Sequence, residues 1–153
     1  MAPFSKDFRP EEFFLKPTEG AGVVTDILGR SIRRCVITTA GSTDEAFGAI
    51  HFDEVYQFDD GVRDEMHWAI ARGDSGAFTG SEITVVGRPK VSLAGPTWRI
   101  RFKRFGQAPF EGATLTYDAR FTQTTDDVVI KRVNISLWGL RLASLVGFHR
   151  HAL

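Results

Sequence analysis

The sequence predicts an all-β fold, an antiparallel up-and-down barrel of about eight to ten strands with a short N-terminal helix. Two observations predict it. Apolar and polar residues alternate along many short segments, and turn-forming residues separate these segments at regular intervals. A two-sheet sandwich is the alternative, because alternation alone does not report closure. With 153 residues and no linker, the chain fits a single domain over 1–153.

The expected helix lies near the N-terminus. Pro10 fits the first helical position, and the two glutamates that follow it lie near the positive end of the helix dipole. This single turn would present Phe13 and Phe14 and plug one end of the barrel. Four phenylalanines fall within residues 1–14, so we also expect an apolar and mobile N-terminal segment.

Ten segments alternate or have β composition. The clearest is "ATLTYDARFTQ", in which Leu115, Tyr117 and Phe121 share one face. The segment 140–149 is ambiguous, because its leucines could also line a helix. The expected strands cover residues 19–28, 31–39, 50–58, 62–71, 77–87, 90–95, 97–104, 113–123, 127–137 and 140–149.

One hairpin can be placed in register. The strands "IHFDEVYQF" and "VRDEMHWAI" flank the turn "DDG". A loop formed by these three residues pairs Phe52 with Trp68 and supplies Gly61 where a positive φ is needed. A two-residue loop would instead place every apolar residue opposite a polar one, so burial favours the longer loop.

The stretch "WRIRFKRF", residues 98–105, has two interpretations. Nucleic-acid-binding sheets expose aromatic and basic side chains together. Here the alternation separates them, so we expect a solvated face over a dry one. The residues expected to be buried are Trp98, Ile100 and Phe102, and those expected to be exposed are Arg99, Arg101 and Lys103. Nineteen basic and nineteen acidic residues balance, and we expect no nucleic-acid partner.

Several other classes are disfavoured. Cys35 is the only cysteine, so the chain has no intrachain disulfide, and a buried inert thiol is expected there. We find no nucleotide-binding, hydrolase or metalloprotease motif, and we expect no catalytic residue, metal or cofactor. His149 and His151 would share a strand face but lack a third ligand, and we interpret them as part of a frayed tail. Without a signal peptide or transmembrane segment, a cytoplasmic location is expected.

Polar residues on apolar faces are the candidate site. The hairpin register places Glu54, Tyr56 and Asp64 on its apolar face, where an unpaired carboxylate is costly. Arg34, which could share a face with Ile32 and Val36, could pair with either carboxylate, and Tyr56, water or a ligand are the other available partners. The expected ligand-binding residues are Arg34, Glu54, Tyr56, Asp64, Trp68, Trp98, Phe102 and Tyr117. The other interpretation is that these polar groups lie at the barrel mouth, where water reaches them.

Four segments in a fixed order carry a resemblance over about residues 13–148: "FFLKPTEGAGVVTDILGRSIRR", "FDDGVRDEMHWAI", "GAFTGSEITVVG" and "LWGLRLASL". Together they resemble an uncharacterised bacterial family, a domain of unknown function whose members are often described as lipoproteins. The resemblance implies a lipocalin-like (calycin) barrel and no established activity. The chain departs from the family in lacking a lipobox cysteine and in having Lys16, Pro17 and Thr18 where glycine is usual.

Three functions remain open. The first is a barrel that binds a small apolar or lipid-like ligand among its interior aromatic residues. The second is an isomerase, cyclase or hydratase that uses Glu54 or Asp64, with its carboxyl pKa raised, as an acid or base. The third is a noncatalytic interaction protein, in which a homodimer could form through a sheet edge or the N-terminal phenylalanines.

Overall fold

The computed structural model describes residues 7–46, 48–71, 85–106 and 111–153. It contains one short helix and nine strands. The elements are α1 (Pro10–Phe13), β1 (Thr18–Asp26), β2 (Ser31–Asp44), β3 (Ala49–Phe58), β4 (Arg63–Ala71), β5 (Val85–Ala94), β6 (Thr97–Phe105), β7 (Thr114–Thr125), β8 (Val128–Leu137) and β9 (Leu140–His151).

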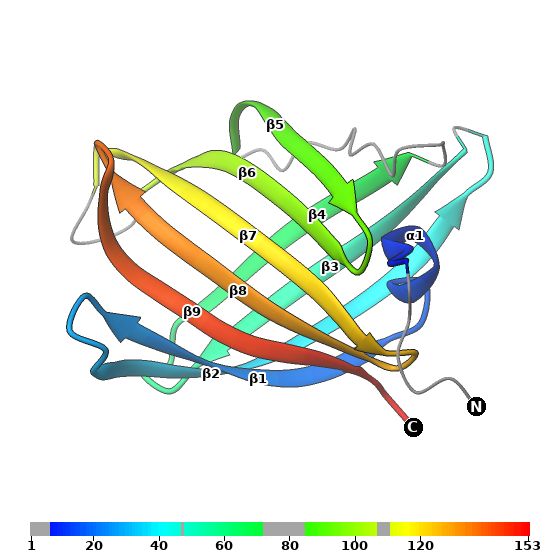
Figure 1. Cartoon of the computed structure of the whole chain (residues 1–153), viewed down its shortest axis with the longest axis horizontal. Helices are drawn as coiled ribbons and strands as arrows, with labels where there is room; N and C mark the ends of the chain where they lie inside the picture. Colours follow the sequence, from blue (N-terminus) through cyan, green and yellow to red (C-terminus); the bar gives the residue numbers. More distant parts are fainter. Residues whose placement is uncertain (1–6, 47, 72–84, 107–110) are drawn as a thin grey trace.

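The strands form one antiparallel sheet that curls into a half-barrel (Figure 1). Their order is β4-β3-β2-β1-β9-β8-β7-β6-β5, so every pairing except β1–β9 joins consecutive strands. Within the described ranges, no backbone pairing joins the edge strands β4 and β5. The predicted all-β, up-and-down fold with a short N-terminal helix is confirmed.

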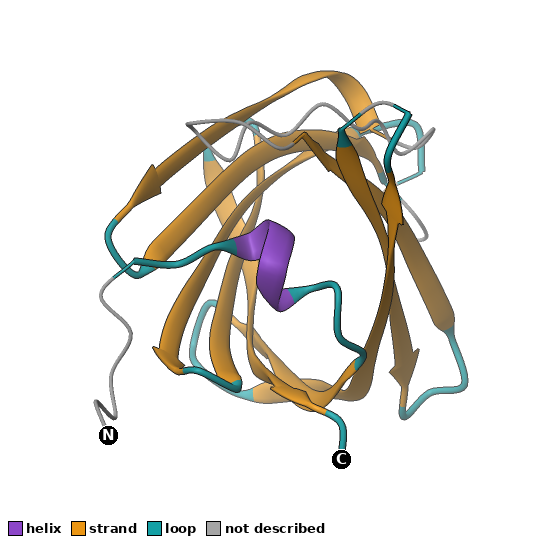
Figure 2. Ribbon diagram, turned by 90° about the vertical axis from the view of Figure 1, so that its right-hand side faces the viewer, coloured by secondary structure: helices purple, strands orange, loops and turns teal. Residues whose placement is uncertain are grey.

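Helix α1 lies across one end of the barrel (Figure 2). The Phe8 amide donates to the Gly95 carbonyl, and the Phe13 carbonyl accepts from His151, so both the β5–β6 turn and β9 hold this segment. Phe8, Phe13 and Phe14 are buried in the core. These three phenylalanines are therefore part of the packed interior, while Arg9 and Glu12 of the same segment are exposed, and residues 1–6 lie outside the described part.

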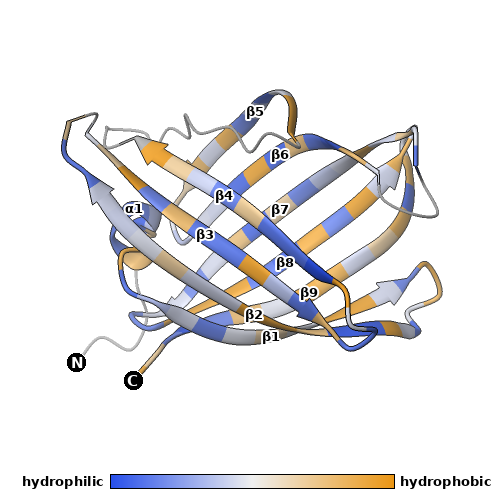
Figure 3. Ribbon diagram, turned by 180° about the vertical axis from the view of Figure 1, so that it is seen from behind, coloured by the Kyte–Doolittle hydropathy of each residue, from blue (hydrophilic) through white to orange (hydrophobic). Residues whose placement is uncertain are grey.

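The interior is filled by alternate residues of each strand, and this alternation is visible along the sheet (Figure 3). On β6, Trp98, Ile100 and Phe102 are buried as predicted. Arg101 and Lys103 are exposed, whereas Arg99 is half-buried because its guanidinium binds the Asp118 carboxylate with two hydrogen bonds of 2.9 and 2.6 Å. This ion pair corrects the expectation that Arg99 is fully exposed.

The β3–β4 hairpin has the predicted register. Phe52 pairs with Trp68, and Tyr56 pairs with Asp64. The Phe58 amide donates to the Val62 carbonyl at 2.9 Å, and Gly61 has a φ of 87°. The turn therefore needs the left-handed conformation that glycine adopts without strain.

The predicted and observed strands differ on the β5 side of the sheet. Residues 77–84 of one expected strand lie outside the described residues, and its last residues join the expected strand 90–95 in β5. A register shift between Val86 and Lys90 interrupts the pairing of β5 with β6. The ambiguous segment at the C-terminus is a strand, β9, and it extends to His151.

Cys35 lies in β2 with its thiol buried, as expected. Burial raises the pKa of this thiol, which keeps it protonated near neutral pH. Among the described residues, no helix is long and apolar enough to cross a bilayer.

Candidate functional site

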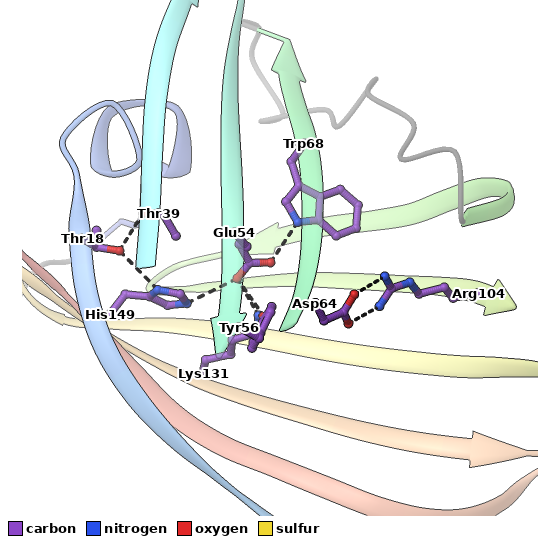
Figure 4. Close-up of polar contacts among 9 residues, drawn as sticks. All are labelled: Thr18, Thr39, Glu54, Tyr56, Asp64, Trp68, Arg104, Lys131 and His149. Atoms are coloured by element: carbon purple, nitrogen blue, oxygen red, sulfur yellow. Dashed lines mark hydrogen bonds and ion pairs between the residues drawn. The ribbon is translucent and has the colours of Figure 1, made fainter. Parts of the chain in front are cut away.

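A cluster of charged and polar side chains lies inside the barrel, centred on Glu54 of β3 (Figure 4). Glu54 is only 2% exposed, and each of its carboxylate oxygens accepts hydrogen bonds. The Trp68 indole donates to Oε1 at 2.9 Å. The Tyr56 hydroxyl and the Lys131 ammonium donate to Oε2 at 3.0 and 2.6 Å. Lys131 also donates to the Tyr56 hydroxyl, which links the three groups into one network.

Strand alternation explains how these residues meet. Glu54 and Tyr56 are two positions apart on β3, so they point to the same face, and Trp68 enters from the paired strand β4. Lys131 comes from β8, across the barrel, where Val129 and Val133 occupy the neighbouring inward positions. The curl of the sheet is therefore what brings Lys131 to Glu54.

The ammonium of Lys131 determines the ionisation of Glu54. Burial alone would raise the pKa of this carboxyl, but the charge of Lys131, aided by His149 and hydrogen bonds, holds the pKa below its usual range. This corrects the expectation of a raised carboxyl pKa. Burial and the adjacent Glu54 charge raise the pKa of the Tyr56 phenol well above its ordinary value, so Tyr56 stays protonated.

His149 of β9 is a second, neutral part of the cluster. Its Nδ1 lies 3.4 Å from the Thr18 hydroxyl, which hydrogen-bonds to Thr39 at 2.6 Å. Its Nε2 lies 3.5 Å from Oε2 of Glu54 and makes no hydrogen bond with any described residue. Burial lowers the pKa of His149 to about 4, and the imidazole is therefore neutral at pH 7.

This buried imidazole makes stability depend on pH. The pKa of His149 falls from 6.5 to about 4 on folding. Between these two pH values, His149 is therefore protonated in the unfolded chain and neutral in the folded chain, which favours unfolding. We expect about 3 kcal/mol of unfolding free energy to be lost between pH 6.5 and 4. Denaturant titrations across this range measure the loss. In H149F, the unfolding free energy should depend much less on pH.

The control for this prediction is H51Q, because His51 is exposed and its imidazole pairs with the Asp44 carboxylate at the surface. H51Q should retain the loss of stability on acidification. Below pH 4.5 the protonation of Glu54 adds a further loss, so the comparison of variants is made above that pH. Equal pH dependence in H149F and the native protein would contradict the assignment.

A second ion pair lies nearer the end of the barrel opposite α1. Arg104 of β6 donates two hydrogen bonds of 2.7 Å to the carboxylate of Asp64, an inward residue of β4 (Figure 4). The pair connects the two sides of the sheet that backbone pairing leaves unjoined. Nearby, the ring of Tyr117 stacks on Phe102 with centroids 5.1 Å apart.

A cavity of about 50 Å³ lies between the two ion pairs. Glu54, Tyr56 and Lys131 line it on one side, and Arg104 lines it on the other. Its apolar lining is formed by Met66, Trp68, Ile100, Phe102, Ala119, Phe121 and Val133. A space of this size holds one or two water molecules, so side chains fill most of the interior.

The structure brings most of the predicted site residues together. Glu54, Tyr56, Trp68 and Phe102 line the cavity, and Asp64 and Tyr117 lie beside it. Trp98 is buried but lies toward the plugged end, where its ring packs against Phe8, Phe14 and Phe121.

The prediction for Arg34 is wrong. Arg34 is exposed on the outer wall, with Ile32 and Val36, and donates to Asp59 at 3.1 Å. Both faces of this segment carry apolar residues, so alternation alone could not orient it. The pairing of Ile37 with Tyr56 fixes the inward set as Cys35, Ile37 and Thr39.

Three interior residues were missed from the sequence. His149 is fully buried, which corrects its interpretation as part of a frayed tail. Lys131 and Arg104 each occupy an inward position in the alternation of their strands, and this alternation could have placed them in the interior. Buried lysine and arginine are rare unless they are paired, so a basic residue at an inward position is weak evidence for an interior site.

The fold and the interior cluster define a lipocalin-like barrel with a buried polar centre. The chain belongs to the DUF3833 family of proteins of unknown function, whose model matches residues 2–150. No curated protein matches the chain significantly.

Two solved structures share the architecture. The S-type phycobiliprotein lyase CPES from Guillardia theta superposes with a TM-score of 0.55 at 11% identity, covering 95% of this chain and 94% of the lyase. The protein EF1p2_mFAP2b, solved with bound DFHBI, superposes with a TM-score of 0.50 at 9% identity, covering 93% of this chain and 97% of that one. Identities this low establish similarity of fold alone.

Proposed function

We propose that the protein binds a small ligand inside the barrel, with the polar end of the ligand on the Glu54 cluster. The observation that carries this proposal is a buried ion pair that borders a cavity. Burying Glu54 and Lys131 yields little net stability, because desolvation offsets their attraction. Buried charged groups beside a pocket are typical of functional sites. The Nε2 atom of His149, buried without a hydrogen bond to a described residue, adds a further group for a polar partner.

The lining suggests the chemistry of the ligand. Its polar end would exchange hydrogen bonds with Tyr56 and Lys131, and its apolar body would contact Trp68, Phe102 and Ile100. Glu54 and Lys131 cancel in charge, as do Asp64 and Arg104. A neutral ligand with one polar end fits this balance better than an ion. The barrel that holds DFHBI provides a precedent of the same fold for a small-molecule ligand.

The present cavity is too small for a lipid-like molecule, so the ligand must displace side chains. Tyr117 and Phe58 are only partly buried and lie toward the end opposite α1. Their movement, with opening of the Asp64–Arg104 pair, would extend the cavity to solvent. We therefore place ligand entry at this end, which we call the mouth.

The test is a titration with N-phenyl-1-naphthylamine, a neutral apolar dye with one N–H group, whose fluorescence rises in apolar surroundings. Ala119 lines the cavity, and A119V adds two carbon atoms to its side chain and introduces a β-branched residue, which suits a strand. We expect A119V to weaken probe binding roughly tenfold or more, because the added carbons occupy the binding space.

A matched control separates the interior from the outer wall. An apolar groove of about 470 Å³, bordered by Val23, Val146 and Phe148, lies on the outer surface and could also take up the probe. V146S should leave the interior affinity unchanged. Probe binding that is lost in V146S and retained in a folded A119V would overturn the proposal.

An enzyme of isomerase, cyclase or hydratase type is the second candidate. The ionised Glu54 carboxylate borders the cavity, which favours a role as a base. Against this, Trp68, Tyr56 and Lys131 already occupy both of its oxygens. Mass spectrometry of ligands extracted from native and E54Q protein distinguishes the two candidates. The same compound in both supports binding alone, and a substrate–product pair supports catalysis.

A further inference from the structure

Large apolar side chains are exposed around the mouth of the barrel. They lie at the β1–β2 turn, the β3–β4 turn, the end of β6 and the β8–β9 turn, all at the end opposite α1 (Figure 1). Trp138 is 90% exposed and Leu28 is 72% exposed. We call this set the mouth tips: Ile27, Leu28, Val62, Phe105, Trp138 and Leu140. Scattered exposed apolar residues are ordinary, but a set gathered on successive turns at one end marks an interaction site.

Trp138 is almost fully exposed, so packing within the described part of the chain does not explain why this position carries a tryptophan. Leu137 pairs with Leu140, so Trp138 and Gly139 form a two-residue turn. Both have positive φ, 50° and 81°, which is the geometry of a type I′ turn. Such turns strongly favour Asn-Gly, and a bulky residue in the left-handed region is strained. A tryptophan that is almost fully exposed therefore opposes the local backbone preference without contributing to the core.

The charges near the mouth tips suit an anionic surface. Each aspartate in the adjoining turns is bound by an arginine: Asp26 by Arg30, Asp59 by Arg34 and Asp60 by Arg33. These carboxylates are therefore neutralised within the chain and would repel phosphate groups weakly. Arg141, next to Leu140, and Lys103, two residues before Phe105, are exposed and form no ion pair with the described part of the chain, and they outnumber the unpaired carboxylate of Glu111.

We propose that the mouth tips dock the barrel onto a phospholipid bilayer that contains anionic lipid, with Trp138 in the interfacial region. Tryptophan is enriched at the boundary between headgroups and acyl chains, where its ring is apolar and its N–H stays hydrogen-bonded. Ile27, Leu28 and Leu140 would enter beside it, while Arg141 and Lys103 contact phosphates. This inference goes beyond ligand binding in the interior and does not depend on it.

A second copy of the chain fits this surface less well. The mouth tips belong to separate turns and strand ends, which lie apart along this end of the sheet (Figure 1). In a two-fold contact through this end, Arg141 and Lys103 of one copy would lie near those of the other copy and repel them. A fluid surface, by contrast, accommodates separate projections.

The experiment uses the full chain and phosphatidylcholine vesicles with and without phosphatidylglycerol. The chain has three tryptophans, of which Trp68 and Trp98 are buried, so an aqueous quencher reports mainly on Trp138. We expect vesicles that contain phosphatidylglycerol to shift the emission to shorter wavelength and to shield it from iodide. Flotation of the protein with the vesicles gives the affinity.

The decisive variant is W138N, which supplies the residue that the turn prefers and should therefore fold at least as well as the native protein. We expect it to bind vesicles roughly tenfold or more weakly, because the interfacial ring is lost. F148S, on the outer wall, should bind as the native chain does. Unchanged vesicle binding by W138N would overturn the proposal. So would a native dimer that W138N converts to a monomer, with no vesicle binding by either.

Discussion

Replacing Lys131 by methionine is expected to lower the free energy of unfolding by about 3–5 kcal/mol at pH 7. The ammonium of Lys131 is the only cation within hydrogen-bonding distance of the buried Glu54 carboxylate among the described residues. Without it, Glu54 must either remain an unpaired charge in the interior or take up a proton. Urea denaturation of the native and variant proteins measures the difference.

Two further variants isolate the cause. K131M/E54L, which removes both charges, should recover most of the lost stability, because an apolar pair avoids the desolvation cost. K103M removes an exposed lysine and should change stability by less than about 0.5 kcal/mol. The deficit of K131M should also narrow on acidification, as Glu54 becomes protonated. A deficit below about 1 kcal/mol at pH 7 would contradict the account of the ion pair.

Replacing Trp98 by alanine is expected to cost about 3–5 kcal/mol, as large-to-small changes in a core do. Its ring is fully buried and lies 5.1 Å from that of Phe121 and 6.4 Å from that of Phe8, measured between centroids. The variant should therefore also loosen the N-terminal segment that plugs the barrel. Calorimetry measures the stability, and hydrogen exchange of residues 8–14 measures the loosening.

The control for W98A is R101E on the outer face of the same strand. Arg101 is exposed, so reversing its charge should change the free energy of unfolding by less than about 0.5 kcal/mol. If W98A loses no more unfolding free energy than R101E does, the aromatic cluster around α1 contributes little to stability.

The fold was predictable because its signal is local. Strict alternation in β6 and β7 and the "DDG" turn between β3 and β4 each specify a strand or a register within a few residues. The hairpin register then correctly placed Glu54, Tyr56 and Asp64 inside the barrel. Where both faces of a strand carry apolar residues, as around Arg34, alternation loses its meaning and the prediction was wrong.

The rest of the site depends on contacts across the barrel, which no local pattern reports. Lys131 lies 77 positions from Glu54 in sequence, and Arg104 lies 40 positions from Asp64. The sequence showed buried carboxylates in need of partners, but several basic residues could have supplied them. Only the curl of the sheet selects among these, and the curl follows from the sum of all strand pairings.

Gly41 of β2 allows one end of the barrel to be covered tightly. A Cβ atom at this position would lie 2.0 Å from the Phe14 carbonyl oxygen, so glycine is what lets the segment after α1 seat against β2. Because this segment packs directly on the strand, a ligand bound as proposed at the Glu54 cluster would exchange with solvent away from α1. Its rate of release would then depend on the side chains at the mouth rather than on the N-terminal segment.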